Sequence, residues 1–231
     1  MLEKLKEEVL KANKLIKEYN LAILTWGNVS GIDREKNMIV IKPSGVDYDD
    51  LTVDDLVVVS LDARVVEGKL NPSTDLKTHI ELYKSFPEIG GVTHTHSTYA
   101  VVFAQANMEI PCLGTTHADN FFGSVPLTRY LTEAEVFEDY ERNTGKVIVE
   151  TMKKYDLHSN PGILVAGHGP FTWGKTPIES VKNSLILEKI AEMAFKTMLL
   201  NPDVKDLPEY VIKKHYLRKH GPDSYYGQKN R

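Results

Sequence analysis

Two of the eight histidines in this 231-residue chain, His94 and His96, stand two positions apart in the segment GVTHTHS at positions 91–97. Side chains two positions apart on a strand leave the same face, so the two imidazoles would point the same way. Two neutral imidazoles side by side suit a divalent metal such as zinc, at nitrogen–metal distances of about 2 Å. Two histidines on the wet face of a half-exposed strand are the alternative, and this pair by itself leaves both interpretations open.

A metal site needs further ligands, and the sequence offers two candidates. His168 ends a predicted buried strand in LVAGHGP, between two glycines that allow close approach of the backbone. Asp75 stands in the first turn of a predicted helix, where the helix dipole also favours a carboxylate, and His79 one turn later could pair with it. Spacing therefore offers a candidate site of Asp75, His94, His96 and His168, against the alternatives of a turn histidine and a helix-terminal carboxylate.

The elements that position these residues follow from hydrophobic periodicity. Helices are predicted near 2–16, 72–86, 98–108, 132–155, 177–200 and 209–219. Strands are predicted at 21–26, 38–43, 55–62, 63–68, 90–97 and 162–174, with 27–37 turn-rich and 115–128 a loop. We expect Ser73 or Thr74 to cap the helix over 72–86, and the helix over 132–155 to break at Gly145. This order predicts an α/β domain with a mixed sheet covered by helices, and not a doubly wound parallel sheet.

The composition bounds the class of protein. The chain is 42% hydrophobic and 26% charged with a net charge of −4, so no global basic field attracts nucleic acid or an anionic membrane. The single cysteine, Cys112, excludes an internal disulfide and a thiolate metal cluster. No Walker or GxGxxG sequence follows a strand, and no apolar run approaches the roughly 20 residues of a membrane span. We expect one cytoplasmic domain over residues 1–231, with neither a nucleic-acid nor a membrane partner.

Six motifs together resemble the class II aldolase family. They are LTWGNVSGID, IKPSGVDYDDL, PSTDLKTHIELYKSFPEIGGVTHTHS, GTTHADNFFG, GHGPFTWGK and KHYLRKHGPDSYYGQ. The paired histidines are shared widely in that family, whereas GTTHAD and YYGQ are narrower and favour its epimerases over its aldolases. The resemblance implies a three-layer α/β/α domain with a central mixed, largely antiparallel sheet. It also implies an isomerase that interconverts L-ribulose 5-phosphate and D-xylulose 5-phosphate in carbohydrate metabolism, whether in arabinose catabolism or in another pathway.

The same resemblance assigns roles to individual residues. It implies a divalent metal, zinc ahead of Mn²⁺ or Co²⁺, bound by Asp75, His94, His96 and His168. It implies an acid–base pair of Asp119 and Tyr226, although the residues alone do not distinguish Tyr226 from its neighbour Tyr225. Contacts to the sugar phosphate would come from Gly27, Asn28, Lys42, Ser44, Gly45, Ser73, Thr74, His215 and Arg218.

The resemblance also implies an assembly and a mechanism. The family forms homotetramers with shared active sites, so the C-terminal helix and tail, about 209–231, would carry Tyr226 to a neighbouring subunit. The reaction would be retro-aldol cleavage between carbons 3 and 4, rotation of glycolaldehyde phosphate, and re-addition. Two alternatives stay open: an aldolase of the L-fuculose 1-phosphate type that releases its products, and a non-catalytic adducin-like interaction module. Such a module is expected to lack the metal ligands.

Overall fold

The computed structural model describes residues 2–227 of the chain. Its helices are α1 (Glu3–Glu18), α2 (Leu76–Ser85), α3 (Thr98–Gln105), α4 (Thr115–Ala118), α5 (Glu133–Met152), α6 (Pro177–Leu200) and α7 (Glu209–His220), with a short 3₁₀ helix η1 (Val53–Asp55). Its strands are β1 (Asn28–Asp33), β2 (Met38–Ile41), β3 (Val57–Ser60), β4 (Val65–Glu67), β5 (Gly91–His94), β6 (Gly162–Val165) and β7 (Gly169–Gly174). Residues 228–231 of the predicted tail lie outside the described residues.

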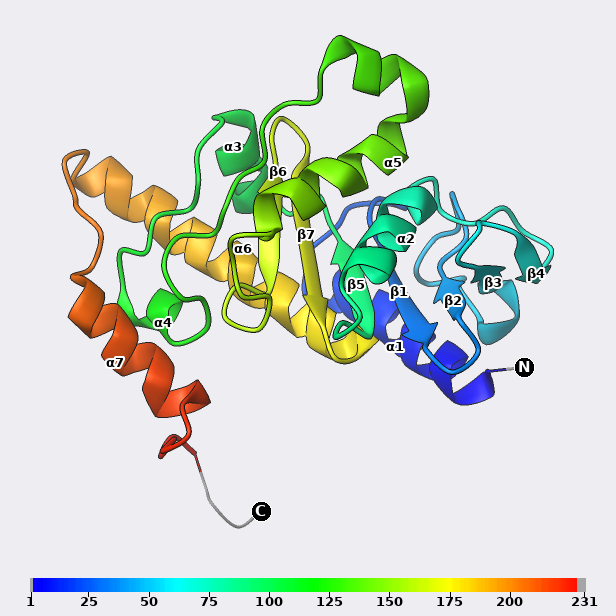
Figure 1. Cartoon of the computed structure of the whole chain (residues 1–231), viewed down its shortest axis with the longest axis horizontal. Helices are drawn as coiled ribbons and strands as arrows, with labels where there is room; N and C mark the ends of the chain where they lie inside the picture. Colours follow the sequence, from blue (N-terminus) through cyan, green and yellow to red (C-terminus); the bar gives the residue numbers. More distant parts are fainter. Residues whose placement is uncertain (1, 228–231) are drawn as a thin grey trace.

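The strands form a seven-stranded sheet in the order β4-β3-β2-β1-β5-β7-β6 (Figure 1). All neighbouring strands in this order pair antiparallel. A parallel pairing appears between Leu127 and Leu164, as an isolated bridge. The expected largely antiparallel sheet is therefore confirmed. His94 is central to it, because it pairs with Asn28 on β1 and with Phe171 on β7.

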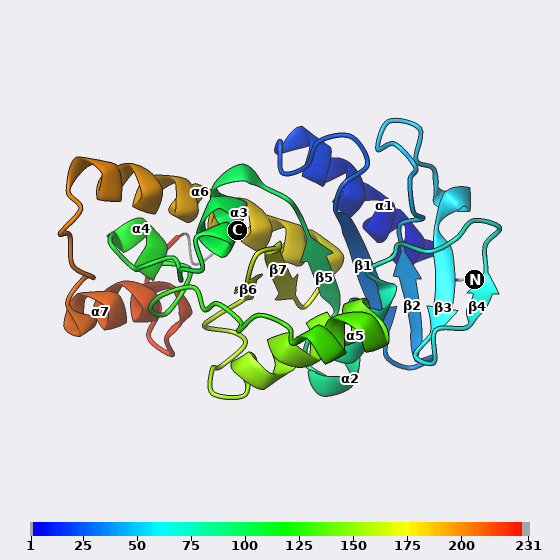
Figure 2. The ribbon, with the colours of Figure 1, turned by 90° about the horizontal axis from the view of Figure 1, so that it is seen from above.

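Helices cover both faces of the sheet, which confirms the three-layer α/β/α arrangement (Figure 2). Helices α1, α3 and α6 lie on one face, and α2 and α5 lie on the other. Successive side chains of strand β5 contact the helices on opposite faces of the sheet. Its Val92 packs into the core beneath α2 and α5, whereas the Thr93 hydroxyl hydrogen bonds to Ser180 of α6 at 2.6 Å. The alternation of side chains along a strand thus places His94 on the α2 side.

Helices α4 and α7 pack against each other beyond β6, away from the sheet faces (Figure 1). The small cluster of Cys112, Ala118 and Ile212 joins them, with Leu207 packed against it. Cys112 is a buried free thiol. Within residues 2–227, no helix is both long enough and apolar enough to cross a membrane.

Three predictions about the elements are wrong. Residues 115–118, expected to belong to a loop, form the short helix α4. Residues 21–26 form an irregular connection in which Leu24 adopts a left-handed φ of 55°, and the strand is the supposedly turn-rich NVSGID. The strand needs glycine at position 31, because a Cβ there would lie only 2.7 Å from Cγ of Pro177. Helix α5 is kinked at Asp139, with φ −164° and ψ 85°, and continues through Gly145. Gly145 serves close packing instead, since a Cβ there would lie 2.6 Å from Cβ of Glu81.

Two further expectations need correction in detail. The N-cap residue of α2 is Asp75, and neither Ser73 nor Thr74 caps the helix. The side chain of Ser73 instead accepts a hydrogen bond from the Asp75 backbone N–H at 3.3 Å. The segment over 162–174 is a hairpin of β6 and β7, so His168 lies in the turn between two strands.

Candidate functional site

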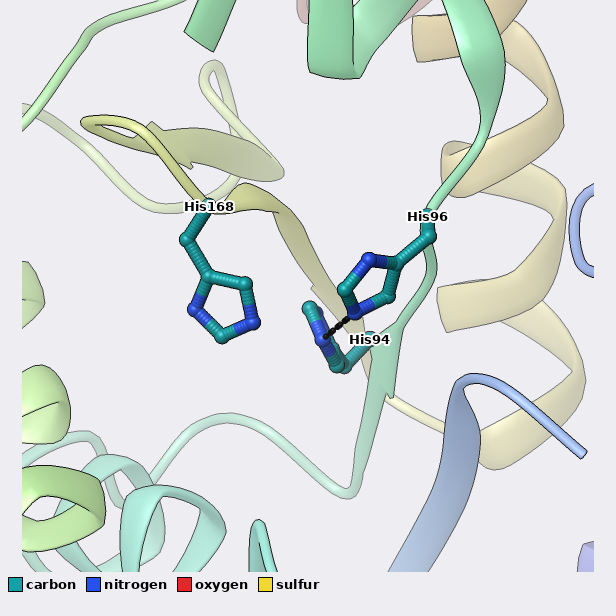
Figure 3. A group of neighbouring side chains, drawn as sticks. All are labelled: His94, His96 and His168. Carbon is teal, nitrogen blue, oxygen red and sulfur yellow. Dashed lines mark hydrogen bonds between the residues drawn. The ribbon is translucent and has the colours of Figure 1, made fainter. Parts of the chain in front are cut away.

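Three histidines from neighbouring strand ends converge on one point (Figure 3). His94 ends β5, His96 follows two residues later, and His168 precedes β7. Because β5 and β7 are antiparallel neighbours, the end of β5 lies beside the start of β7. One ring nitrogen from each histidine lies within 4.8 Å of the others. His96 lies just beyond the strand, so the two rings meet through the extended segment after β5 and not within a regular strand.

The protonation of these rings favours metal binding. Nδ1 of His94 lies 3.0 Å from the carbonyl oxygen of Pro170, to which it donates its proton, leaving the Nε2 lone pair directed at the cluster. Burial lowers the pKa of His96 to about 4 and that of His168 to about 3, so both rings are neutral at pH 7. The Nε2 atoms of His94 and His96 lie 3.0 Å apart, and a shared proton or a cation is needed between them. This donor set fits a divalent metal such as zinc.

Asp75 adds a carboxylate beside the histidines. Its Oδ2 accepts a hydrogen bond from Nδ2 of Asn28 at 2.7 Å, and the same Nδ2 lies 3.0 Å from Oγ of Ser73. Burial alone would raise the pKa of Asp75, but His94, His79 and the Asn28 hydrogen bond bring that pKa below its usual value. The three histidines form a tight group that could hold a metal ion, and Asp75 lines the same pocket.

The pocket has a volume of about 550 Å³. It collects the strand ends of β1, β2, β5 and β7 and the start of α2. The structure brings eleven of the fifteen predicted site residues to its wall: Gly27, Asn28, Lys42, Ser44, Gly45, Ser73, Thr74, Asp75, His94, His96 and His168.

The pocket wall combines a buried cation with exposed hydroxyls. Lys42 is 1% exposed, and burial lowers the pKa of its ammonium group to about 8. Its Nζ lies 4.9 Å from the centre of the Tyr48 ring. Ser44 and Thr74 are exposed on the turns beside it. A cation and small hydroxyls on adjacent turns are suited to binding an anion such as a phosphate.

One glycine of this wall is required by its surroundings. Gly27 has a φ of 76°, and a Cβ at this position would lie 2.7 Å from the carbonyl oxygen of His94. The backbone turn that carries Asn28 into the pocket can therefore lie directly against the end of β5.

Two polar residues of α5, Tyr140 and Glu141, line the pocket without having been predicted. Both follow the kink at Asp139, whose carboxylate is held by Nζ of Lys77 at 3.0 Å. The hydroxyl of Tyr140 lies 3.5 Å from Nδ1 of His168. No sequence motif marked these residues. Only a helix break predicted at Asp139, in place of Gly145, would have indicated them. Thr25, Trp26 and Pro43 also line the pocket without having been predicted.

The remaining four predicted residues form a second cluster around Asp119, at the end of α4. Arg218 of α7 donates to its carboxylate from Nε at 3.0 Å and from Nη2 at 2.6 Å, and Nδ1 of His215 lies 3.1 Å from Oδ1. Burial opposes the charge on Asp119, but the bonds from Arg218 and His215 hold the pKa of the carboxyl below its usual value. The ring of Tyr226 lies 5.5 Å from the Arg218 guanidinium and is 63% exposed. None of these four residues lines the pocket.

Comparison with known proteins places these features in a family. The family model described as "Class II Aldolase and Adducin N-terminal domain" matches residues 7–195. Curated proteins named L-ribulose-5-phosphate 4-epimerase UlaF, from Salmonella paratyphi A and Salmonella typhi, are each 52% identical over 228 residues, which is 99% of this chain and 100% of theirs. A solved structure of an L-fuculose 1-phosphate aldolase matches with a TM-score of 0.78 and 25% identity, covering 92% of this chain and 94% of that one.

Proposed function

The chain belongs to the class II aldolase and adducin family, and we propose that it is the isomerase that interconverts L-ribulose 5-phosphate and D-xylulose 5-phosphate. The relatives that share 52% identity over almost the whole chain support this function. The observation that carries it is the convergence of His94, His96 and His168 in a pocket that also holds Asp75 and a buried lysine. A non-catalytic adducin-like module would not need this arrangement.

The substrate dictates the reaction. Its carbonyl is at carbon 2 and the inverted centre is carbon 4, so the hydrogen on carbon 4 is not adjacent to the carbonyl. Its removal would give no stabilised enolate. Cleavage between carbons 3 and 4 sends the bonding electrons into the carbonyl and leaves the enediolate of dihydroxyacetone with glycolaldehyde phosphate. Rotation of the aldehyde before the bond re-forms gives the other epimer.

Four residues would hold the metal: Asp75, His94, His96 and His168. The neutral histidines and the single carboxylate suit Zn²⁺, and Mn²⁺ or Co²⁺ can bind the same donors. When bound, the metal supplies Lewis-acid stabilisation of negative charge that develops on substrate oxygens. The Pro170 carbonyl keeps the His94 proton on Nδ1, so Nε2 stays available as a ligand.

The pocket wall would bind the rest of the substrate. We assign Lys42, Ser44, Gly45, Ser73 and Thr74 to the phosphate and the sugar hydroxyls, with Gly27 and Asn28 closing the pocket beside the metal ligands. These contacts would anchor glycolaldehyde phosphate while its carbonyl turns.

Asp119 and Tyr226 would supply the acid and the base from a neighbouring subunit. The hydroxyl on carbon 4 must lose a proton during cleavage and regain one after rotation, and it points in opposite directions in the two epimers. Both residues lie outside the pocket of their own chain, directly after α4 and after α7, which supports a shared site in a homotetramer. His215 and Arg218 would orient Asp119 and approach the substrate phosphate. We place this homotetramer in the cytoplasm.

The competing function is an aldolase that releases the aldehyde, which the structural similarity to L-fuculose 1-phosphate aldolase keeps open. Incubation of the metal-loaded protein with L-ribulose 5-phosphate distinguishes the two. The epimerase yields D-xylulose 5-phosphate, whereas the aldolase yields free glycolaldehyde phosphate. Loss of either product on addition of a chelator identifies the metal dependence.

A further inference from the structure

A line of buried polar side chains runs from the metal-site carboxylate into the core between α2 and β1. Asp75, His79 and Tyr83 follow one another at one-turn spacing along α2, with Asp75 as its N-cap, and Asn28 and Ser30 are two residues apart on β1. The two rows are hydrogen bonded. Nδ2 of Asn28 donates to Asp75 at 2.7 Å, and Oγ of Ser30 lies 2.7 Å from Nδ1 of His79 and 2.8 Å from the hydroxyl of Tyr83.

His79 is the incomplete member of this line. Its ring is fully buried and edge-on to Phe171, with 6.2 Å between ring centres. Its Nε2 has no hydrogen-bond partner among the described residues. Buried polar atoms without partners are rare in native proteins because their desolvation is not repaid. A packing role alone would not require a nitrogen at this position.

The surroundings of His79 indicate which group Nε2 serves. A helical side chain leans toward the preceding turn, so the ring of His79 extends along α2 toward Asp75. The Asp75 carboxylate is also the strongest charge that acts on the ring. Carboxylates that bind a metal are themselves commonly hydrogen bonded by an outer group that fixes their orientation.

We propose that His79 is a positioning residue that donates its Nε2 proton to the Asp75 carboxylate when that carboxylate holds the metal. The inference rests on the proposed metal-dependent function. For Nε2 to carry the proton, the hydroxyl of Tyr83 must donate to Oγ of Ser30, and the hydroxyl of Ser30 must donate to Nδ1 of His79. Asn28 and His79 together then set the direction of the Asp75 side chain.

Two substitutions distinguish the role of Nε2 from that of Nδ1 in the His79 ring. His79→Gln keeps an amide group near the position of Nε2, whereas His79→Asn keeps a polar group only near Nδ1. His117→Gln is the matched control, because His117 is also a buried neutral histidine but bonds to the Gly123 carbonyl outside the pocket. Zinc affinity is measured for each purified full-length variant by competition with a chromophoric chelator, and the melting temperature is measured without metal.

We expect His79→Asn to bind zinc about 10- to 100-fold more weakly than the wild type. His79→Gln is expected to retain most of the affinity, and His117→Gln is expected to retain all of it. Equal affinity in His79→Asn and the wild type would overturn the proposal, as would equal weakening in both His79 variants. A wild-type protein without zinc affinity would instead refute the metal site itself, so the two failures are distinguishable.

A measurement on the unmodified protein keeps the test independent of folding in the variants. Nitrogen-15 chemical shifts of the histidine rings identify the protonated nitrogen in the zinc-loaded protein, with the His79 signal assigned from its absence in His79→Gln or His79→Asn, whichever folds. If neither folds, the signal is assigned through bonds in the wild type. We expect His79 to carry its proton on Nε2. A proton on Nδ1 would contradict the proposal.

Discussion

Arg218 binds the carboxylate of Asp119 through two hydrogen bonds, Nε to Oδ1 at 3.0 Å and Nη2 to Oδ2 at 2.6 Å. Paired bonds of this kind fix both the position and the ionised state of a carboxylate. They fasten α7, and with it Tyr226, to the end of α4. The proposed acid–base residues therefore form one unit that lies outside the pocket of its own chain.

Subunit mixing tests whether this unit serves a neighbouring pocket. His96→Asn removes a proposed metal ligand, and Tyr226→Phe removes the proposed acid–base hydroxyl, so each homo-oligomer is expected to be nearly inactive. Hybrids formed by dissociating and reassociating the two are expected to regain activity in about a quarter of their sites, because an intact pocket then meets an intact tail by chance. Hybrids as inactive as the parents would show that each chain uses its own tyrosine.

The buried Lys42 predicts the pH dependence of substrate binding. Its ammonium group is charged below its pKa of about 8 and loses its charge above that pH. We expect kcat/KM for the sugar phosphate to fall as the pH rises through this value. Lys42→Met should lower kcat/KM by about 10- to 100-fold at pH 7, as expected for one lost hydrogen bond to a charged group. Lys42→Arg is the control, and its alkaline fall should move to higher pH; an unchanged alkaline limb would contradict the assignment.

Two buried histidines outside the proposed ligand set add to the acid sensitivity that His96 and His168 confer on the metal-free protein. Burial lowers the pKa of His79 to about 3 and that of His117 to about 4, while unfolded histidine titrates near pH 6.5. Between these values the unfolded chain binds protons that the folded chain does not, so stability is lost as the pH falls below 6.5. Each histidine contributes up to about 1.4 kcal/mol per pH unit.

Urea unfolding of the metal-free protein at pH 7.5, 6.5 and 5.5 measures this loss. The free energy of unfolding should fall about three times less between the first two values than between the second and the third. His117→Gln should reduce the slope below pH 6.5 by about one proton. A free energy of unfolding that does not change down to pH 5.5 would contradict the neutral state of these rings.

Two glycines of the pocket provide a matched test of the backbone. Gly27 and Gly45 have similar φ values of 76° and 72°, but a Cβ would meet the His94 carbonyl oxygen at 2.7 Å only at Gly27, and nothing within 4 Å at Gly45. Gly45→Ala should destabilise the protein by about 1 kcal/mol from backbone strain alone. Gly27→Ala should cost about 3 kcal/mol and weaken metal binding, because the end of β5 must shift. Equal losses in urea unfolding would show that the contact with His94 is unimportant.

The histidine cluster was predictable because its signal is local. The spacing of His94 and His96 identifies them in the sequence, and the two flanking glycines identify His168. The structure joins them because β5 and β7 are neighbours, a pairing that no local pattern in the sequence specifies. The resemblance to the class II aldolase family supplied that long-range information.

The error at β1 has a physical cause. Asn28, Ser30 and Gly31 are typical of turns, so propensity argued against a strand. In the structure the first two hydrogen bond to Asp75 and His79, and Gly31 admits Pro177. Tertiary contacts at a functional site thus override local preference. The kink at Asp139 was missed for a similar reason, since its tie to Lys77 of α2 is a long-range contact.

The most direct test of the central claim is the conversion of L-ribulose 5-phosphate by the purified, zinc-loaded protein, followed with and without a chelator. The proposed function predicts D-xylulose 5-phosphate in a chelator-sensitive reaction that leaves no free glycolaldehyde phosphate. Release of that aldehyde without epimerisation would instead identify an aldolase. Zinc binding with neither product would contradict the assignment of this substrate.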